Sequence, residues 1–348
     1  MKQVTESDQG CILIVGPSWV GDMVMAQSLF RTLKARSPHV AIDVIAPAWS
    51  QPLLARMPEI RNSLILPIGH GELKLSVRHG LGKSIEGRYR QAIVLPNSLK
   101  SALIPFFADI EIRTGWRGEM RYVLLNDMRL LSKKRYPLMI ERFAALAYPP
   151  GSPLPEKLPW PQLCTATEDS EAAREIFSLD KQRPVLALCP GAEFGPSKRW
   201  PEQYYAAVAD EMIRRGWQVW IFGSANDSAV AHSIAAALAP DAALHCHNLA
   251  GKTQLAQAID LLAEADCVVS NDSGLMHIAA ALQRPLVVIY GSTSPGFTPP
   301  LAEQVAILSI PVDCGPCFKR ECPLGHMKCM HGVAPARVVD AIGEVAPR

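Results

Sequence analysis

The chain has 348 residues, of which 49% are hydrophobic and 20% charged, and its formal net charge at pH 7 is only +2. This length is enough for two domains of ordinary size, and the composition is that of a folded globular protein. So small a net charge argues against a general nucleic-acid-binding protein. The polar first ten residues lack a signal-peptide pattern. No apolar run approaches the roughly 20 residues of a membrane helix, so we expect a cytoplasmic protein.

Strands alternate with helices through the first 148 residues. A buried strand at Cys11–Val15 is followed by a loop with two glycines and by a helix from about Asp22. Further strands are predicted at 41–47, 64–70 and 91–98, with helices at 72–87 and from about Lys100. This alternation is typical of a parallel, doubly wound sheet. The stretch 110–127 is predicted to be rich in loops.

The loop after the first strand, GPSWVGD, is a candidate ligand site. It does not fit the dinucleotide fingerprint G-x-G-x-x-G, which weighs against an oxidoreductase. The carboxylate of Asp22 stands at the helix start, where the helix dipole favours its ionised form. Asp22 is therefore either a reactive carboxylate or only the cap of this helix.

Residues 100–142 carry nine Lys or Arg and five Asp or Glu, a local charge of +4. Such a patch attracts anionic groups, although an ordinary solvated loop would show the same charge. The sequence Gly-Trp-Arg-Gly at 115–118 favours anion binding.

Six prolines between 149 and 163 predict a linker, because proline interrupts helices and central strands alike. We expect a first domain at 1–160 and a second at 161–348. The second domain repeats the alternation of strands and helices. Its strands are predicted at 185–189, 218–224, 244–249, 267–270 and 286–291, and its helices at 168–177, from about 227, at 274–282 and at 335–345.

Loops that follow strands of the second domain carry groups suited to phosphate or sugar. The loop 190–199 holds Lys198 and Arg199, 223–227 holds Asp227, and 271–277 holds Asp272, Ser273, Gly274 and His277. Free N–H groups at a helix start bind phosphate oxygens, although Asp272 or Ser273 can also simply cap the helix. The chain lacks a P-loop, which weighs against a nucleotide hydrolase. Two such domains suit a transferase with an activated nucleotide donor on the second.

Four cysteines near the C-terminus form the pattern C-x2-C-x4-C-x6-C: Cys314, Cys317, Cys322 and Cys329. Four thiols this close together suit tetrahedral zinc, with His326 and His331 as alternative ligands. A disulfide or redox pair and four free thiols are the other two interpretations. None of the three requires a catalytic role.

Four segments resemble the ADP-heptose heptosyltransferases of glycosyltransferase family 9. They are GPSWVGDMVMAQSLFRTLKARSP, LPNSLKSALIPFFADIEIRTGWRGEMR, CPGAEFGPSKRWP and VVSNDSGLMHIAAALQRPLVVIYGSTSP. The resemblance implies a GT-B fold, two Rossmann-like domains facing across a cleft. It also implies transfer of L-glycero-D-manno-heptose from ADP-heptose to the first heptose of the lipopolysaccharide inner core, with inversion. The terminal helix 335–345 would pack back on the first domain, as in similar GT-B proteins.

The resemblance also implies roles for individual residues. Asp22 matches the general base and Lys198 the lysine that balances charge on the ADP leaving group, and the remaining roles concern binding. The donor would be held by Asp272, Ser273, Gly274 and His277, with Asp227 and Thr253 near ribose and adenine; charge logic assigns the acceptor to Lys100, Arg113, Arg117 and Arg121. No cofactor is required for catalysis, and the cysteine group lies outside the matched segments.

Three rivals remain: a member of the same family with another acceptor, a sugar-nucleotide-binding protein without turnover, and a nucleotide-sugar epimerase of GT-B shape. The basic patch counts against the epimerase, which needs no lipid-linked acceptor. The implied acceptor is a Kdo-heptose carried on a lipid. We therefore expect peripheral contact with the cytoplasmic face of the inner membrane, through the basic stretch 100–142 and the apolar Phe106 and Phe107.

Overall fold

The computed structural model describes residues 10–69 and 71–347 and divides into two compact units, Met1–Pro161 and Gln162–Arg348. The boundary falls inside the proline-rich segment 149–163, one residue from the expected position. The polar N-terminal residues 1–9, and residue 70 at the end of the predicted strand 64–70, lie outside the described residues.

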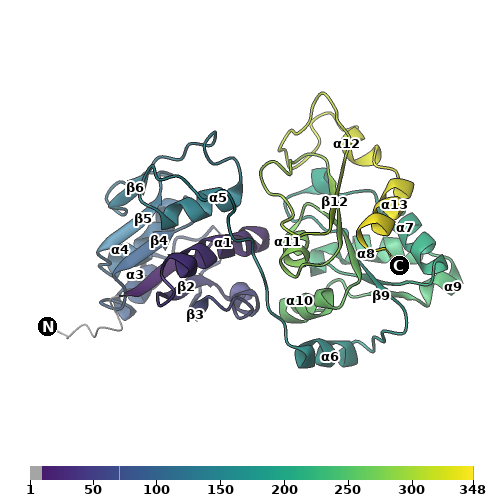
Figure 1. Ribbon diagram of the computed structural model, residues 1–348, viewed down its shortest axis with the longest axis horizontal. Coiled ribbons are helices and arrows are strands. Elements are labelled where there is room, and N and C mark those ends of the chain that lie inside the picture. Colours follow the sequence, from purple (N-terminus) through teal and green to yellow (C-terminus); the bar gives the residue numbers. More distant parts are fainter. Residues whose placement is uncertain (1–9, 70, 348) are drawn as a thin grey trace. The chain divides into compact units, whose positions relative to one another are not determined.

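The first unit is a parallel sheet with helices on its faces (Figure 1). Its strands are β1 (Cys11–Val15), β2 (Ala41–Pro47), β3 (Ile60–Leu66), β4 (Gln91–Val94), β5 (Ile112–Trp116) and β6 (Asp127–Arg129), in the order β3-β2-β1-β4-β5-β6. Its helices are α1 (Val20–Arg36), α2 (Gln51–Leu54), α3 (Leu75–Ser84), α4 (Leu103–Phe107) and α5 (Met139–Ala144), with 3₁₀ turns η2 (Ala48–Ser50), η3 (Leu99–Ala102) and η4 (Ala145–Ala147).

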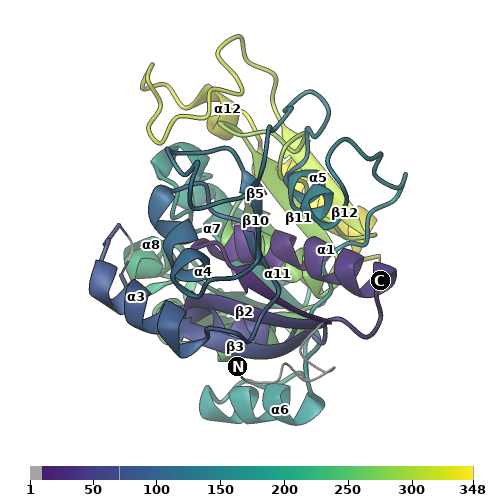
Figure 2. The same ribbon diagram turned by 90° about the vertical axis from the view of Figure 1, so that its left-hand side faces the viewer.

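The central strands of this unit are apolar on both faces because helices cover both sides of the sheet. One face carries Leu13, Val15, Ala92 and Val94, which belong to one core cluster, and the other carries Ile14 and Ile93, which are fully buried. Figure 2 shows α1 beside α5, and α3 beside α4.

Two strands of this unit differ from the prediction. Residues 110–127 are rich in loops, as expected, but they also contain the strand β5, whose polar Arg113 and Thr114 obscure its strand character. The strand predicted at 64–70 begins earlier, at Ile60. The prediction missed its first residues because Arg61 and Asn62 are polar, and they lie exposed in β3 at the edge of the sheet.

The second unit repeats the same architecture (Figure 1). Its strands are β7 (Val185–Cys189), β8 (Gln218–Ile221), β9 (Cys246–Asn248), β10 (Cys267–Asn271), β11 (Leu286–Tyr290) and β12 (Val305–Ser309), in the order β12-β11-β10-β7-β8-β9. Its helices are α6 (Thr167–Ile176), α7 (Glu202–Arg214), α8 (Ser228–Ala236), α9 (Pro240–Ala243), α10 (Leu255–Ala263), α11 (Gly274–Ala281), α12 (Lys328–His331) and α13 (Pro335–Val345), with 3₁₀ turns η5 (Pro196–Lys198) and η6 (Ala225–Asp227).

The two sheets have equivalent strand orders, and every pairing in them is parallel. In each unit the first three strands are added one after another toward one edge of the sheet. The fourth strand then pairs with the first, and the last two are added toward the other edge. This confirms the predicted α/β class with two Rossmann-like units, the GT-B fold. The path reverses between β1 and β4 and between β7 and β10, and ligands bind such folds at the strand ends of these switch points.

The C-terminal helix α13 packs within the second unit, against α7, β11 and β12. Its apolar residues Val338, Val339, Ile342 and Val345 all belong to the core cluster of that unit. The apolar face of this helix is therefore buried within the second unit.

None of the helices within 10–69 and 71–347 is both long enough and apolar enough to cross a membrane.

This packing predicts that Ile342→Ala will lower the free energy of unfolding of the second unit by about 2–5 kcal/mol, through lost apolar contact and the cavity left behind. Ile342 is 1% exposed, whereas Glu344 on the same helix is exposed. Glu344→Ala should therefore change stability by less than about 0.5 kcal/mol. Urea unfolding, monitored by hydrogen exchange of the amides in β11 and β12, measures the stability of both variants. Equal effects of the two substitutions would contradict this packing.

Candidate active site

The switch point of the second unit is occupied by an ion pair between Lys198 and Asp272. Lys198 ends η5 in the loop after β7, and Asp272 directly follows β10. The Lys198 Nζ donates to Asp272 Oδ2 at 2.7 Å and to the Asp272 backbone oxygen at 3.2 Å. Thr293 Oγ1, from the loop after β11, donates to the same Oδ2 at 2.6 Å. Three loops thus meet on one buried carboxylate, which orients the lysine.

Helix α11 begins beside this ion pair. Ser273 is its N-cap, and its Oγ accepts from Met276 N at 3.4 Å, so the capping role that the sequence allowed for Ser273 is present. The first turn from Gly274 presents N–H groups beside the Lys198 ammonium, an arrangement suited to phosphate oxygens. Asp272 precedes the cap and is held by Lys198 and Thr293 instead.

His277, one turn into α11, is only 6% exposed. Burial lowers its pKa to about 4; Asp272 opposes this shift, while the positive charge of Lys198 adds to it. The imidazole is therefore neutral at physiological pH, and it adds no charge to the site.

Asn271, the last residue of β10, was not singled out from the sequence, yet it fixes the loop that carries Lys198. Its Oδ1 accepts from Trp200 N at 3.1 Å and from the Tyr205 hydroxyl at 3.0 Å, and its Nδ2 donates to Pro190 O at 2.6 Å. The available signal was the amide side chain of the turn Asn-Asp-Ser-Gly, which directly follows an apolar strand. A polar side chain that is buried there must find hydrogen-bond partners.

Asp227 has a structural task of its own. Its Oδ2 accepts from Ser224 N at 2.9 Å and Ser224 Oγ at 2.8 Å, and Arg199 NH2 lies 3.8 Å from Oδ1. A Cβ at Gly191 would lie 2.5 Å from its Cγ, so the first loop of the unit passes directly over Asp227.

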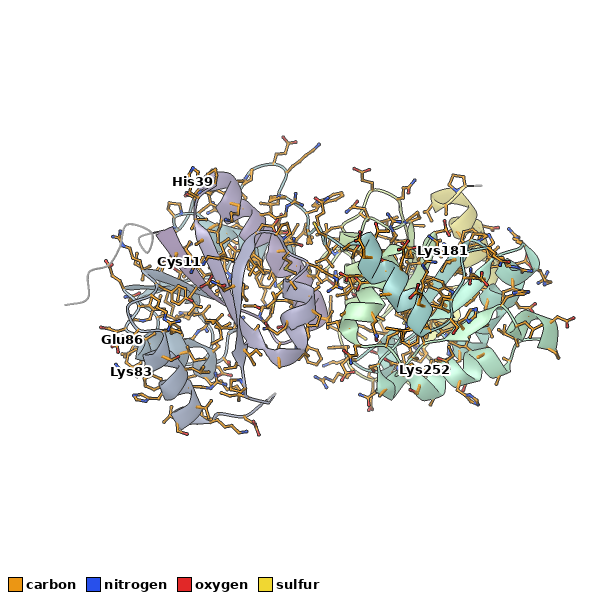
Figure 3. All side chains as sticks on the ribbon, turned by 90° about the horizontal axis from the view of Figure 1, so that it is seen from below. Cys11, His39, Lys83, Glu86, Lys181 and Lys252 are labelled. Carbon is orange, nitrogen blue, oxygen red and sulfur yellow. The ribbon has the colours of Figure 1, made fainter. Side chains whose placement is uncertain are left out.

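Thr253 lies in the neighbouring loop after β9, which the Gly251 N to Gly223 O bond of 3.0 Å joins to the loop of Asp227. Lys252, labelled in Figure 3, is exposed in the same loop. The side chains of Asp227 and Thr253 thus stand on adjacent loops at the same sheet edge as Lys198.

Asp22 lies at the switch point of the first unit. It is the third residue of α1, whose N-cap is Trp19, so the interpretation of Asp22 as the capping residue is wrong. Gly16 N donates to Ile45 O of β2 at 2.9 Å, and Leu95 N donates to Val15 O of β1 at 3.1 Å, so the loops after β1 and β4 leave the sheet next to each other. Asp22 is half-buried beside these loops.

Arg121 was expected to meet acceptor anions, and this expectation was wrong. Its side chain is 1% exposed, and burial lowers its pKa to about 10. Its two terminal nitrogens donate within the protein: to Pro96 O at 2.6 Å, Ser98 O at 3.3 Å, Ser101 Oγ at 3.2 Å, Asn97 Oδ1 at 3.3 Å and Trp116 O at 2.6 Å. Arg121 therefore holds the loop after β4 in place.

The other predicted acceptor cations differ in exposure. Arg113 is half-buried and donates to Leu124 O at 2.8 Å and Ile110 O at 2.5 Å, so it too is largely structural. Lys100 is half-buried beside the same loop, and Arg117 is exposed. Of the four, Arg117 presents the most accessible charge.

These positions fit the chemistry of group transfer from a nucleotide diphosphate. The second unit offers an ammonium, free helix N–H groups and a neutral imidazole for a diphosphate. The first offers a carboxylate at a switch point, a suitable general base.

Comparison with known proteins gives an independent result. The family model described as glycosyltransferase family 9 (heptosyltransferase) matches residues 78–328. The chain is 51% identical over 337 residues to lipopolysaccharide heptosyltransferase 2 of Salmonella typhimurium, covering 95% of this chain and 97% of that protein. It is 47% identical over 345 residues to lipooligosaccharide heptosyltransferase 2 of Haemophilus ducreyi, covering 96% and 99%. The solved structure of Escherichia coli ADP-heptose heptosyltransferase II superposes with a TM-score of 0.87 at 48% identity, covering 96% of this chain and 98% of that one.

The buried position of Arg121 predicts that Arg121→Met will destabilise the first unit by about 3 kcal/mol, because it leaves several buried oxygens without a donor. Arg117→Met, at an exposed position nearby, should cost less than about 0.5 kcal/mol. Chemical denaturation compares the two variants. A similar loss for both would contradict the structural role of Arg121.

The low pKa of His277 predicts a pH-dependent stability. Between its ordinary value of 6.5 and its folded value of about 4, the unfolded state binds a proton that the folded state does not, so stability is complete above 6.5 and falls as pH decreases. The loss is up to about 3 kcal/mol by pH 4. His277→Gln should flatten this part of the stability curve, whereas His232→Gln, at an exposed position of the same unit, should not. If the stability of His277→Gln depended on pH as steeply as that of the wild type, the role of His277 in this pH dependence would be refuted.

Proposed function

The chain belongs to glycosyltransferase family 9, and from this premise we propose that it transfers L-glycero-D-manno-heptose from ADP-heptose to the first heptose of the lipopolysaccharide inner core. The chain covers almost the whole length of two relatives that bear the name heptosyltransferase 2. The observation that carries the proposal is the Lys198–Asp272 pair beside the start of α11, a receptor for a diphosphate.

In the proposed donor complex, the diphosphate lies against the N–H groups at the start of α11. The Lys198 ammonium faces the phosphate oxygens, with Asp272 and Thr293 holding it in place. Asp272 itself carries negative charge, so it repels a phosphate and acts through the lysine. Asp227 and Thr253, on the adjacent loops, are placed to meet the ribose and adenine.

The proposed reaction is a single inverting displacement. An acceptor hydroxyl attacks the anomeric carbon, the bond from that carbon to the diphosphate oxygen breaks, and Asp22 takes the proton of the hydroxyl. Negative charge grows on the departing ADP. Lys198 and the helix N–H groups stabilise that charge, and this electrostatic help takes the place of a metal ion.

The nearest rival is a family member with another acceptor. Relatives named heptosyltransferase 2 match across nearly the whole chain, whereas heptosyltransferase 1 of Pseudomonas aeruginosa is 35% identical over only 42% of it. This difference favours the acceptor of the heptosyltransferases II. Product formation distinguishes either transferase from a binding protein, because a binding protein has no turnover.

The acceptor is lipid-linked, so the proposal includes peripheral contact of the first unit with the cytoplasmic face of the inner membrane. The most exposed large apolar residues here are Met120 at 80%, Val123 at 75% and Leu130 at 68%. In the sequence they stand between the exposed cations Arg117 and Lys133 of the basic stretch. Phe106, at 36%, is less exposed, and its ring packs under Arg113. Apolar side chains with neighbouring cations suit an anionic membrane surface.

The activity is tested by ADP release from ADP-heptose with a core acceptor bearing one heptose. Wild-type release should require the acceptor, and Asp22→Asn should lower kcat by about 10²- to 10⁴-fold, the usual contribution of a general base. Glu86→Gln serves as the control, because Glu86 is an exposed carboxylate of the first unit whose partner is Lys83 (Figure 3). Release that ignores the acceptor would contradict a transferase, and donor binding without release would indicate a binding protein.

Membrane contact is tested by flotation with vesicles containing anionic lipid. Replacing Arg117 with Gln should weaken binding about fivefold, since each cation near such a surface contributes about 1 kcal/mol. Met120→Asn with Val123→Asn should weaken it further. Lys83→Gln, which removes a cation on α3, should leave binding unchanged. Full vesicle binding by the triple variant at 117, 120 and 123 would refute this surface.

A further inference from the structure

The four cysteines of the segment 314–329, which the reaction does not use, lie together in the fold. This segment connects β12 to α12, and it forms the irregular yellow-green loop next to α12 in Figure 1. All four thiols are free and half-buried. Together with His326 and Ser197 they line a single small pocket. Residues as far apart as Cys314 and Cys329 are thus brought to one place.

The backbone turns tightly directly after Cys322. Gly325 N donates to Cys322 O at 3.1 Å, and Gly325 has a φ of +69°, a conformation that glycine adopts without strain. This turn leads the chain from Cys322 back toward Cys329, the fourth cysteine of the pocket.

Within the described residues, no three His, Cys, Asp or Glu side chains surround a common point as metal ligands do. The four sulfurs line the pocket without closing on its centre. Zinc bound at the usual Zn–S distance of about 2.3 Å therefore requires rotation of these thiols about their single side-chain torsion and a shift of the loop backbone.

This segment is also joined to the loop that carries Lys198. Residues 318–321 lie between the second and third cysteines, and their carbonyls accept from Ser197: Ser197 N donates to Arg320 O at 3.1 Å, and Ser197 Oγ to Lys319 O at 2.5 Å. Phe318 N donates to Ser292 O at 2.8 Å. A Cβ at Gly195 would lie 2.4 Å from Arg320 O, so the two backbones are in direct contact.

The contact continues to Lys198 itself. The guanidinium of Arg320 lies 5.7 Å from the ring centroid of Phe194, and the Lys198 ammonium lies 5.0 Å from the same centroid. Lys198 follows Ser197 directly. Residues 318–321 therefore contact both the backbone next to Lys198 and the ring beside its ammonium.

We propose that Cys314, Cys317, Cys322 and Cys329 bind one zinc ion, and that the bound ion positions the loop of Lys198 through residues 318–321. Four thiolates match the tetrahedral preference of zinc. On binding, each thiol releases its proton, so the zinc with four thiolates carries a charge of −2. The segment 314–329 carries Lys319, Arg320 and Lys328 against Glu321, and this net positive charge offsets part of the charge of the zinc site.

The first experiment measures the metal content of the full chain, purified without chelator, by elemental analysis. One zinc per chain is expected, together with thiolate-to-cobalt absorption after exchange with Co²⁺. Cys317→Ser combined with Cys322→Ser should abolish both signals. Cys164→Ser, at an exposed cysteine elsewhere in the unit, should retain them. A metal-free protein that binds neither ion, or a disulfide between any of the four, would overturn the zinc site.

The second experiment uses the wild-type chain, so it does not depend on folding of a variant. Zinc is removed with a chelator and then restored, while hydrogen exchange of residues 314–330 and of 191–199 is followed. Both segments should lose protection without zinc and regain it on readdition. Loss confined to 314–330 would leave the site standing but overturn its link to Lys198.

The effect on the donor rests on the proposed function, whereas the metal content and hydrogen exchange do not. ADP affinity should fall about tenfold on zinc removal, the usual scale for loss of a supporting contact, and return with zinc. Unchanged ADP affinity in a zinc-free chain would refute the positioning role. Failure of heptose transfer, with zinc-dependent ADP affinity intact, would refute the proposed function alone.

Discussion

The arrangement of the second unit depends on one ion pair, between the ammonium of Lys198 and the carboxylate of Asp272. The two side chains are 14% and 4% exposed, so neither charge is well solvated without the other. Removing one partner of such a pair typically costs about 3–5 kcal/mol. Because Thr293 donates to the same carboxylate, the pair ties together the loops after β7, β10 and β11. In the proposed donor complex, a diphosphate would meet a lysine whose position the pair already fixes.

The first unit also uses a buried side chain to fix the loops at its strand ends, but there the buried charge is an arginine that supports a loop from below. Arg121 is buried beneath the loop after β4, and its hydrogen bonds hold residues 96–101 beside the loop that leads to Asp22. The cation there serves as support, while Arg117 remains exposed to solvent. In the second unit, backbone contacts from residues 318–321 give comparable support to the Lys198 loop. In both units the support for a functional loop lies later in the sequence than the loop itself.

The sequence was sufficient to predict the two doubly wound units, because near-continuous apolar runs such as VLALC and LVVIY have few alternatives to buried parallel strands. It also located Lys198 and Asp272 at strand ends, where ligand groups gather. It did not predict β5 or the early start of β3, whose polar residues hide the strand pattern. Nor did charge alone separate Arg121 from Arg117, because burial depends on how the chain folds back over residues 96–101. The task of Asn271 was missed for the same reason, since its partners lie about 70 to 80 residues earlier in the chain.

The most direct test of the account is the affinity of ADP and AMP for the wild-type chain and for Lys198→Met, measured by titration calorimetry. If Lys198 holds the diphosphate, the variant should bind ADP at least about tenfold more weakly, because a charge-assisted hydrogen bond is worth about 1.5–3 kcal/mol. AMP, which lacks the second phosphate, should be affected much less. Equal losses for both nucleotides, or no loss for ADP, would contradict the central claim that the Lys198–Asp272 pair is the diphosphate receptor.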